Sequence, residues 1–340
     1  MATMQVRTLG ASRIPASAVG LGTFAIGGWF WGGTDEKKSI EAIHASLDAG
    51  ITLIDTAPIY GFGLAEEIVG KALRGRRSGV VVATKCGLRW DTDKGDFNGY
   101  ADEKGPRGTP GRYEIHRYLG PESIRYEVEQ SLRRLGTDVI DLYQTHWQES
   151  TTPIEVTMEA LLALQRQGKI RAIGVSNVSV EQLRRYGAVA SAQEKFNLLD
   201  RGIEENGLAA FCAERHVSIL SYFSMEQGLL TGAMQPGRSF ADGDTRRGNP
   251  MFSARTIGRV NAILADLRPF AEKYRATLGQ LVIALTARQP GITHVLVGAR
   301  DAAQARENAV GGCLDLSASD VREMNVIASR LQAVRAEGRA

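Results

Sequence analysis

The chain has 340 residues, of which 43% are hydrophobic and 23% are charged, and its formal net charge is +3. This composition is typical of a globular protein with a large core, and so small a charge gives no indication of nucleic-acid or membrane binding. No run of about 18 apolar residues is present, and the N-terminal residues lack the apolar segment of a secretory signal. The sequence therefore predicts a cytoplasmic protein.

The cysteines and histidines give no indication of a metal site or of disulfides. Cys86, Cys212 and Cys313 are odd in number and far apart, and no Cys-x-x-Cys pair or His cluster at metal-ligand spacing occurs. We therefore expect reduced thiols and no metal.

The first predicted element is a small β-hairpin. Its strands run from Met4 to Leu9 and from Ile14 to Ser17, joined by the turn Gly10-Ala11-Ser12-Arg13. We expect the hairpin to lie outside the main fold and to plug the end opposite the active site.

Beyond the hairpin, short β-branched runs alternate with longer amphipathic segments, which is the pattern of repeated βα units. The predicted strands are Val19 to Phe24, Thr52 to Asp55, Val80 to Thr84, Val139 to Gln144, Ala172 to Val175, Ala192 to Phe196, Val217 to Tyr222 and His294 to Val297. The predicted helices are Glu36 to Ala49, Ala65 to Leu73, Pro121 to Leu135, Pro153 to Gln167, Ser179 to Val189, Glu204 to Arg215, Leu278 to Arg288 and Asp301 to Val310.

Eight such units predict an α/β fold in which residues 1–340 form one (β/α)8 TIM barrel domain. Two long segments, 87–120 and 223–254, follow strand ends and are expected to be loops at the C-terminal face of the barrel. Loops longer than about 12 to 15 residues are usually functional or disordered, and barrel enzymes place their chemistry at this face.

Four ionisable residues stand at or just after predicted strand ends: Asp55, Tyr60, Lys85 and His146. A carboxylate, a phenol, an ammonium and an imidazole brought together form a proton-transfer device. A nearby ammonium favours the phenolate and so lowers the pKa of a phenol, which is about 10 when unperturbed. The alternative is structural: a buried Asp55–Lys85 ion pair, with Tyr60 packed on the rim and His146 capping a strand.

The chain resembles the aldo-keto reductase family along nearly its whole length, and in particular a bacterial subgroup linked to inositol catabolism and general stress. The segments that carry the resemblance are Val19-Gly20-Leu21-Gly22-Thr23-Phe24, Asp55-Thr56-Ala57-Pro58-Ile59-Tyr60-Gly61, Ala83-Thr84-Lys85, Tyr143-Gln144-Thr145-His146-Trp147, Gly174-Val175-Ser176-Asn177, Asn197-Leu198-Leu199-Asp200-Arg201 and Gly228-Leu229-Leu230-Thr231-Gly232. The subgroup is indicated by Trp31-Gly32-Gly33-Thr34-Asp35-Glu36.

The resemblance implies metal-independent hydride transfer between a nicotinamide cofactor and a carbonyl or alcohol. Tyr60 would be the general acid and base, and Lys85 would lower the pKa of its phenol. Asp55 would pair with Lys85, and His146 would orient the substrate carbonyl. The substrate would be a small molecule.

The resemblance also implies a set of cofactor contacts. Ser176, Asn177 and Gln193 would hold the carboxamide, Tyr222 would stack on the nicotinamide ring, and Thr23 and Asp55 would lie beside the cofactor. Gly298, Arg300, Gln304 and Asn308 would form the adenosine-phosphate pocket. Arg300 favours NADP(H), although Asp301 would repel a phosphate and NAD(H) stays possible.

All four tryptophans follow strand ends or lie in the long loops that border the predicted catalytic mouth. We expect Trp31 and Trp147 to line the substrate pocket together with Tyr60 and His146, and leave Trp90 open; packing of the loops is the alternative.

Two other functions stay open. The first is a regulatory module with little turnover, like the potassium-channel β-subunits of the same family. The second is an aldolase that forms a Schiff base on Lys85, although the neighbouring Asp55 disfavours it. The sequence leaves the physiological substrate, the reaction direction and the oligomeric state undetermined.

Overall fold

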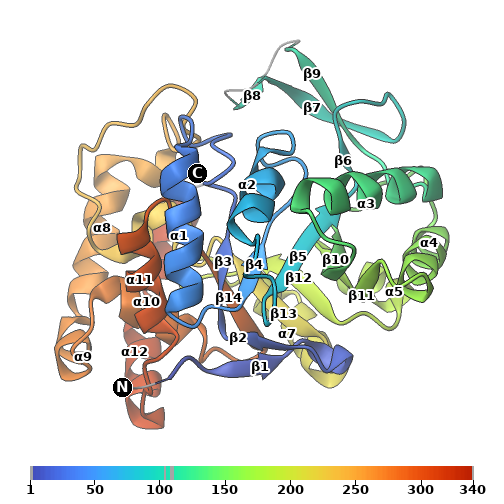
Figure 1. The fold of residues 1–340 in the computed structure, drawn as a ribbon. Coiled ribbons are helices and arrows are strands. Elements are labelled where there is room, and N and C mark those ends of the chain that lie inside the picture. Colours follow the sequence, from blue (N-terminus) through green and yellow to red (C-terminus); the bar gives the residue numbers. More distant parts are fainter. Residues whose placement is uncertain (1–2, 103–104, 108–110, 339–340) are drawn as a thin grey trace.

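The computed structural model describes residues 3–102, 105–107 and 111–338 and contains a closed barrel of parallel strands surrounded by helices (Figure 1). The barrel strands are β3 (Val19–Gly22), β4 (Leu53–Asp55), β5 (Val81–Cys86), β10 (Ile140–Thr145), β11 (Ile170–Ser176), β12 (Ser191–Lys195), β13 (Ser218–Tyr222) and β14 (Ile292–Gly298). They pair in chain order, and β14 closes on β3. The predicted (β/α)8 barrel is confirmed.

The barrel strands are apolar on both faces because one face packs in the barrel interior and the other packs against helices. All six residues of β5 are buried, and so are all six of β10. Where polar residues interrupt these runs near the C-terminal ends, as at Lys85 and Gln144, they also lie fully buried. The C-terminal end of the barrel therefore contains buried polar side chains, as a functional site does.

The helices that follow the strands agree with the predicted positions, with one exception. They are α1 (Glu36–Asp48), α2 (Leu64–Ala72), α3 (Pro121–Leu135), α4 (Ile154–Arg166), α5 (Val180–Tyr186), α10 (Leu278–Thr286) and α11 (Ala302–Gly311). The segment predicted as one helix from Glu204 to Arg215 is instead two, α6 (Gly202–Glu205) and α7 (Leu208–Glu214), because Gly207 between them has a positive φ of 81°.

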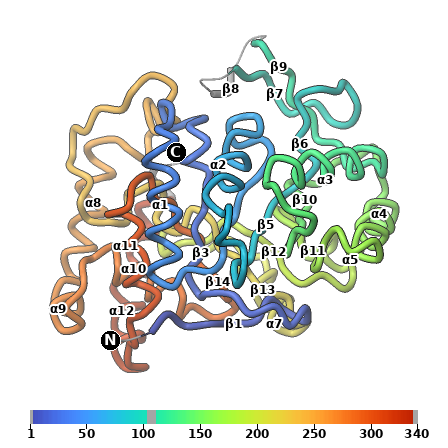
Figure 2. Tube along the Cα trace, in the orientation of Figure 1, coloured from blue at the N-terminus to red at the C-terminus, as the bar shows by residue number. Residues whose placement is uncertain are grey.

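The N-terminal hairpin closes the opposite end of the barrel, as predicted. It consists of β1 (Val6–Thr8) and β2 (Pro15–Ser17), joined through the 3-10 turn Gly10–Ser12. Leu9 and Ile14 pack against the apolar residues of the barrel interior, and the backbone N–H of Gly10 donates to Ser218 Oγ at 2.8 Å. Figure 2 shows this hairpin running below the barrel strands, at the far end from the long insertion.

The prediction of a loop at 87–120 is wrong, because this segment carries its own antiparallel sheet. The sheet has the order β6-β9-β7-β8, with β6 (Leu88–Arg89), β7 (Asp96–Asp102), β8 (Gly105–Arg107) and β9 (Tyr113–Arg117). The strands are short and the segment is rich in Gly and Asp, so the sequence pattern did not predict them. Hydrogen bonds from Ser150 to Asp96, at 2.7 and 2.8 Å, tie the sheet to the loop after β10.

The second long segment is mostly irregular, as predicted, and contains the 3-10 turns Glu226–Thr231 and Pro250–Phe252. Four helices after it were not predicted: α8 (Ala254–Ala265), α9 (Arg268–Lys273), α12 (Ala318–Ser329) and α13 (Leu331–Gly338). They form a second apolar cluster with α10 outside the barrel. Within the described residues, no helix is both long and apolar enough to span a membrane.

Candidate active site

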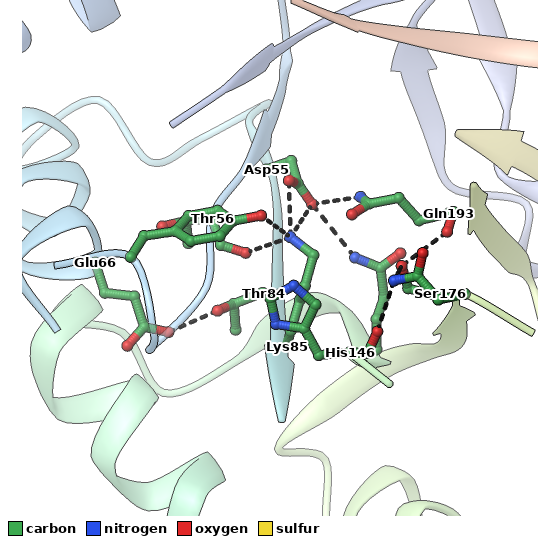
Figure 3. Close-up of polar contacts among 11 residues, drawn as sticks. Asp55, Thr56, Glu66, Thr84, Lys85, His146, Ser176 and Gln193 are labelled. Carbon is green, nitrogen blue, oxygen red and sulfur yellow. Dashed lines mark hydrogen bonds and ion pairs between the residues drawn. The ribbon is translucent and has the colours of Figure 1, made fainter. Parts of the chain in front are cut away.

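Asp55 and Lys85 meet at the C-terminal end of the barrel (Figure 3), and Lys85 also joins Asp55 to Tyr60. Its ammonium Nζ donates to Asp55 Oδ2 at 2.8 Å, to Asp55 Oδ1 at 3.0 Å and to the carbonyl oxygen of Thr56 at 2.9 Å. It also donates to the Tyr60 hydroxyl at 3.3 Å. The lysine is fully buried, so this charge acts on the phenol without screening by bulk water.

The carboxylate of Asp55 has further partners from the other side of the barrel. The side-chain amide of Gln193 donates to Asp55 Oδ1 at 2.7 Å, and that of Gln144 does so at 3.4 Å. A buried carboxylate needs such donors as well as a cation to offset its lost hydration. Three neighbouring side chains, those of Lys85, Gln193 and Gln144, therefore donate to the carboxylate of Asp55.

The pKa directions show which groups carry a proton at neutral pH. Burial lowers the pKa of Lys85, but Asp55 and Tyr60 outweigh burial and the net pKa is raised, so the ammonium is charged. Burial raises the pKa of Tyr60 more than Lys85 lowers it, so the phenol is neutral. The expected lowering by Lys85 is present, but in this structure it is the smaller effect.

His146 follows β10 and faces the same space as Tyr60. Their ring centroids lie 5.9 Å apart with the planes at 80°. Burial, followed by the charge of Lys85, lowers the pKa of His146 well below its ordinary value, so the imidazole is neutral. A neutral imidazole can donate one hydrogen bond to an oxygen placed between it and the phenol.

A cavity of about 1020 Å³ opens over these groups. Its volume lies at the upper end of the range of about 300–1,000 Å³ typical of small-molecule sites. The sequence-predicted residues that line it are Trp31, Asp55, Tyr60, His146, Trp147, Ser176, Asn177, Gln193, Tyr222, Gly298, Arg300, Gln304 and Asn308. Two predicted residues do not line it: Lys85 lies behind Asp55 and Tyr60, and the fully buried Thr23 lies behind the wall.

Ser176, Asn177 and Tyr222 form one hydrogen-bonded group on the wall. Asn177 Nδ2 donates to Ser176 Oγ at 3.0 Å, and the Tyr222 hydroxyl donates to Asn177 Oδ1 at 2.7 Å. Ser176 Oγ in turn donates to the carbonyl oxygen of Gln193 at 2.7 Å. Helix α5 is capped by Ser179 in a capping box with Gln182, so Ser176 and Asn177 are free of that role.

The other end of the cavity is formed by the turn from β14 into α11. Asp301 caps α11 by accepting from the backbone N–H of Gln304 at 2.9 Å, and Gln304 Oε1 accepts from the backbone N–H of Arg300 at 3.0 Å. Asn308 Nδ2 donates to the carbonyl oxygen of Gly298 at 3.0 Å. Asp301 is occupied as a cap and does not line the cavity, so its side chain is directed at the helix backbone and not at the cavity.

The cavity suits a nicotinamide dinucleotide in the chemistry of its lining residues. One end has amide and hydroxyl groups beside the buried phenol, and the other end has Arg300 beside the N-terminus of α11, where an anion is favoured. Gly22 and Gly298 line the wall between them, and a Cβ on either would meet no atom closer than 3.8 Å, so their backbone borders open space. The residues present therefore fit such a cofactor.

Aromatic side chains dominate the wall near Tyr60. Trp31 and Trp147 line the cavity as expected, and so does Trp29, whose indole N–H donates to the carbonyl oxygen of Asp102 at 2.9 Å. Trp90 does not line it and packs instead on Phe62, with ring centroids 5.5 Å apart. Trp90 thus has the structural role that the sequence left open.

The sequence analysis missed a buried ion pair that supports the rim. Arg246 donates to Asp244 from Nε at 2.9 Å and from Nη2 at 2.7 Å, and its guanidinium stacks 4.9 Å from the Trp31 ring. The spacing of Asp244 and Arg246 in an otherwise polar loop was the available signal. This arginine has Asp244 as its partner and itself lines the cavity, beside the Trp31 ring.

A second missed cluster lies after β12 and β13. Lys195 pairs with Glu226 at 3.2 Å and with Asp200 at 3.4 Å, and Asn197 donates to Glu226. Lys195 and Glu226 both line the cavity. No local sequence signal joins these residues, because the loop after β13 brings Glu226 back to β12.

A parallel barrel whose mouth combines a neutral phenol, a buried ammonium and a cavity of about 1020 Å³ with an arginine at its other end is typical of a barrel oxidoreductase. The chain belongs to the aldo/keto reductase family, whose family model matches residues 18–328. Enzymes of this family act on small-molecule carbonyl compounds.

Individual relatives agree with this assignment. The chain is 40% identical to the aldo-keto reductase YhdN of Bacillus subtilis, over 95% of this chain and 93% of that protein. It is 38% identical to the NADH-specific methylglyoxal reductase of Escherichia coli, over 95% of this chain and 98% of that protein.

Solved structures show the same architecture. The glycerol dehydrogenase of Gluconobacter oxydans superposes with a TM-score of 0.83 at 35% identity, covering 97% of this chain and 96% of that one. An aldo-keto reductase of Klebsiella pneumoniae in complex with NADPH superposes with a TM-score of 0.68 at 26% identity, covering 97% and 96%.

Proposed function

We propose that the protein reduces an aldehyde or ketone reversibly with NADPH, and that Tyr60 is its general acid and base. The observation that carries this proposal is the placement of the Tyr60 hydroxyl 3.3 Å from the buried Lys85 ammonium, at the wall of the cavity. A phenol so placed can give its proton to a carbonyl oxygen and is left as a phenolate beside a cation.

The roles of the four groups follow from their protonation states. The neutral Tyr60 donates the proton, and the charged Lys85 stabilises the phenolate that remains. Asp55 keeps Lys85 protonated. The neutral His146 donates a hydrogen bond to the carbonyl oxygen and fixes its position between the two rings.

A bound nicotinamide supplies the hydride that adds to the carbonyl carbon. Ser176, Asn177 and Gln193 would hold its carboxamide, and Tyr222 would support its ring, since these residues share the wall opposite the phenol. Arg300, Gln304 and Asn308 would hold the adenosine end. The aromatic residues Trp31 and Trp147 would contact the substrate and exclude water.

NADPH is proposed over NADH because Arg300 is a planar donor that lines the adenosine end. Its Nη2 donates to the carbonyl oxygen of Gly33 at 3.1 Å, which holds the guanidinium over the cavity. The NADPH complex of the Klebsiella relative supports this choice, whereas the NADH-specific relative of E. coli supports NADH as the cofactor.

The site does not favour Schiff-base chemistry. A lysine nucleophile must be neutral, whereas the pKa of Lys85 is raised because Asp55 and Tyr60 outweigh burial. We further propose that residues 1–340 act as one domain and that the chain belongs to the bacterial subgroup indicated by Trp31-Gly32-Gly33-Thr34-Asp35-Glu36.

The decisive experiment is a spectrophotometric assay of NADPH oxidation with a panel of aldehydes, ketones and sugars, repeated with NADH. The panel includes methylglyoxal and, in the oxidative direction, glycerol, because these compounds appear in the names of two relatives. Failure of every compound with both cofactors would overturn the proposal and favour a regulatory role.

A further inference from the structure

Glu194 is a buried acid at the active-site end of β12 that the proposed chemistry does not use. It is 5% exposed and lies between Gln193 and Lys195, both of which line the cavity, while Glu194 itself does not. Because side chains alternate along a strand, its carboxyl lies on the outer face of the barrel. The described part of the chain offers it no lysine, arginine or histidine partner within ion-pair distance.

The partners of this carboxyl are backbone groups of the neighbouring strand end. Its Oε1 accepts from the backbone N–H of Val178 at 3.0 Å. Burial raises the pKa of Glu194 to about 8, against the opposing effect of the N–H groups of Val178 and Asn177. A buried acid without a cation is costly, and here its hydrogen bonds all go to one turn.

That turn holds Asn177 in a left-handed conformation, with φ of 57°. Such a conformation is unfavourable by about 1–2 kcal/mol for most residues, and asparagine is among the few that adopt it routinely. It persists only where the surroundings determine the backbone. Two consecutive residues of β12 do so here: the carbonyl oxygen of Gln193 accepts the N–H of Asn177 at 3.2 Å, and Glu194 accepts the N–H of Val178.

The hydrogen bond to Val178 matters because its N–H belongs to the peptide plane that follows Asn177. Fixing this plane fixes ψ of Asn177, while the bond to Gln193 fixes the plane before it. With both planes held, the Cα–Cβ bond of Asn177 has only one direction, which starts the side chain toward its partners. It donates to the carbonyl oxygen of His146 at 2.9 Å and accepts from Tyr222 at 2.7 Å.

We propose that Glu194 is a positioning residue that acts from outside the barrel on the cofactor wall, the hydrogen-bonded group formed by Ser176, Asn177 and Tyr222. It holds the backbone at Asn177, and the side chain of Asn177 in turn holds Tyr222 and the backbone of His146. The inference rests on the proposed function for the cofactor at this wall. Without the acceptor, the peptide plane at Val178 can rotate. The side-chain amide of Asn177 then loses its hydrogen bonds to His146, after β10, and to Tyr222, at the end of β13.

The test compares three variants. Glu194→Leu removes the acceptor while filling the space, Glu194→Gln keeps an acceptor oxygen of the same reach, and Asp320→Ala removes a buried acid that pairs with Lys273 far from the cavity. NADPH affinity is measured by nucleotide fluorescence, and hydrogen exchange is followed in apo protein on the peptide that contains residues 176–178.

We expect Glu194→Leu to raise the Kd for NADPH about tenfold and to speed exchange at 176–178, as for other residues that act through a ligand-binding neighbour. Glu194→Gln should stay within about twofold of the wild type in both measurements, and Asp320→Ala should lower Tm without changing either. Wild-type affinity and wild-type exchange in Glu194→Leu would overturn the inference.

The two readouts separate this inference from the proposed function. If the wild type bound neither NADPH nor NADH, the proposed function would fail, while the exchange measurement would still show whether Glu194 holds the turn. Glu194→Met provides a second apolar side chain of similar volume if the leucine variant does not fold.

Discussion

Gln193 and Asp55 are joined across the barrel by a hydrogen bond of 2.7 Å, although 138 positions separate them in the sequence. Asp55 also pairs with Lys85 at 2.8 Å. One carboxylate thus fixes both the ammonium that acts on the phenol and an amide of the cofactor wall. In the proposed function, proton transfer and cofactor placement would therefore be coupled through Asp55.

The first prediction concerns this shared carboxylate. Asp55→Asn removes the counter-charge of Lys85, so burial will lower the pKa of the lysine and weaken its stabilisation of the phenolate. We expect kcat to fall by about 10²-fold or more. The pH dependence of kcat should shift as well, and a variant with an unchanged pH profile would show that Asp55 has no part in proton transfer.

Replacing Tyr60 by phenylalanine removes the proposed proton donor and leaves its ring in place. Turnover should drop by about 10²–10⁴-fold, the usual contribution of general acid catalysis. Binding of NADPH, measured by fluorescence, should stay within about twofold of the wild type. Tyr100→Phe, on β7 of the inserted sheet, is the matched control and should retain full activity; comparable turnover in both variants would exclude Tyr60 as the acid.

Arg300→Ala tests the choice of cofactor. A charge-assisted hydrogen bond contributes about 1.5–3 kcal/mol, which corresponds to a loss of affinity of about 10- to 100-fold. We expect this loss for NADPH, with little change for NADH. Arg288→Ala, which breaks an exposed pair with Asp315, serves as the control. Equal losses for the two cofactors would mean that Arg300 does not contact the 2′-phosphate.

Gly27 supports Tyr60 through direct backbone contact. A Cβ at this position would lie 2.7 Å from the carbonyl carbon of Tyr60 and 2.8 Å from its oxygen, so Gly27→Ala must displace that backbone. Displacements of about 1 Å can cost up to about 10²-fold in rate, and we expect a loss of this order in kcat/KM. Gly258→Ala, where a Cβ meets nothing within 4 Å, should be silent, and a fully active Gly27→Ala would show that the site tolerates the shift.

His294 makes the fold sensitive to acid at the opposite end of the barrel. Burial lowers its pKa to about 4, and its Nδ1 lies 2.9 Å from the carbonyl oxygen of Ser17 in the hairpin. The unfolded chain takes up a proton near pH 6.5, whereas the folded chain does so only near pH 4, so stability is lost as the pH falls through this window.

The loss attributable to this histidine is up to roughly 3 kcal/mol. Denaturant unfolding from pH 7 to pH 4 should show it as a difference between the wild type and His294→Gln, which lacks the titrating group. Parallel stability curves for the two proteins would rule out the effect.

The barrel was predictable because its strands are buried on both faces and its helices are amphipathic, which leaves a regular alternation in the sequence. The placement of Asp55, Lys85 and His146 followed from the rule that strand ends meet at one face. The inserted sheet was not predictable in this way, since its Gly- and Asp-rich strands cover only one side of the mouth. Neither was Glu194, whose role depends on the backbone of a different strand.

Some parts of the site depend on contacts between segments far apart in the chain. The pair of Arg246 with Asp244 lies in an irregular loop, and the contact of Lys195 with Glu226 depends on how that loop returns to β12. The net pKa of Tyr60 also required the structure, because burial opposes the nearby cation and only the depth of the phenol decides which effect is larger.

The four-stranded sheet on one side of the mouth is hydrogen-bonded within itself, whereas Asp55 and Lys85 stand on barrel strands and Tyr60 and His146 lie in the segments that follow barrel strands. Residues of the sheet can therefore be exchanged, or its strands lengthened, without moving the register that holds Asp55, Lys85 and His146. A graft of residues 88–117 from a relative with another substrate would change what enters the mouth and leave the arrangement of Asp55, Lys85 and His146 beneath it unchanged.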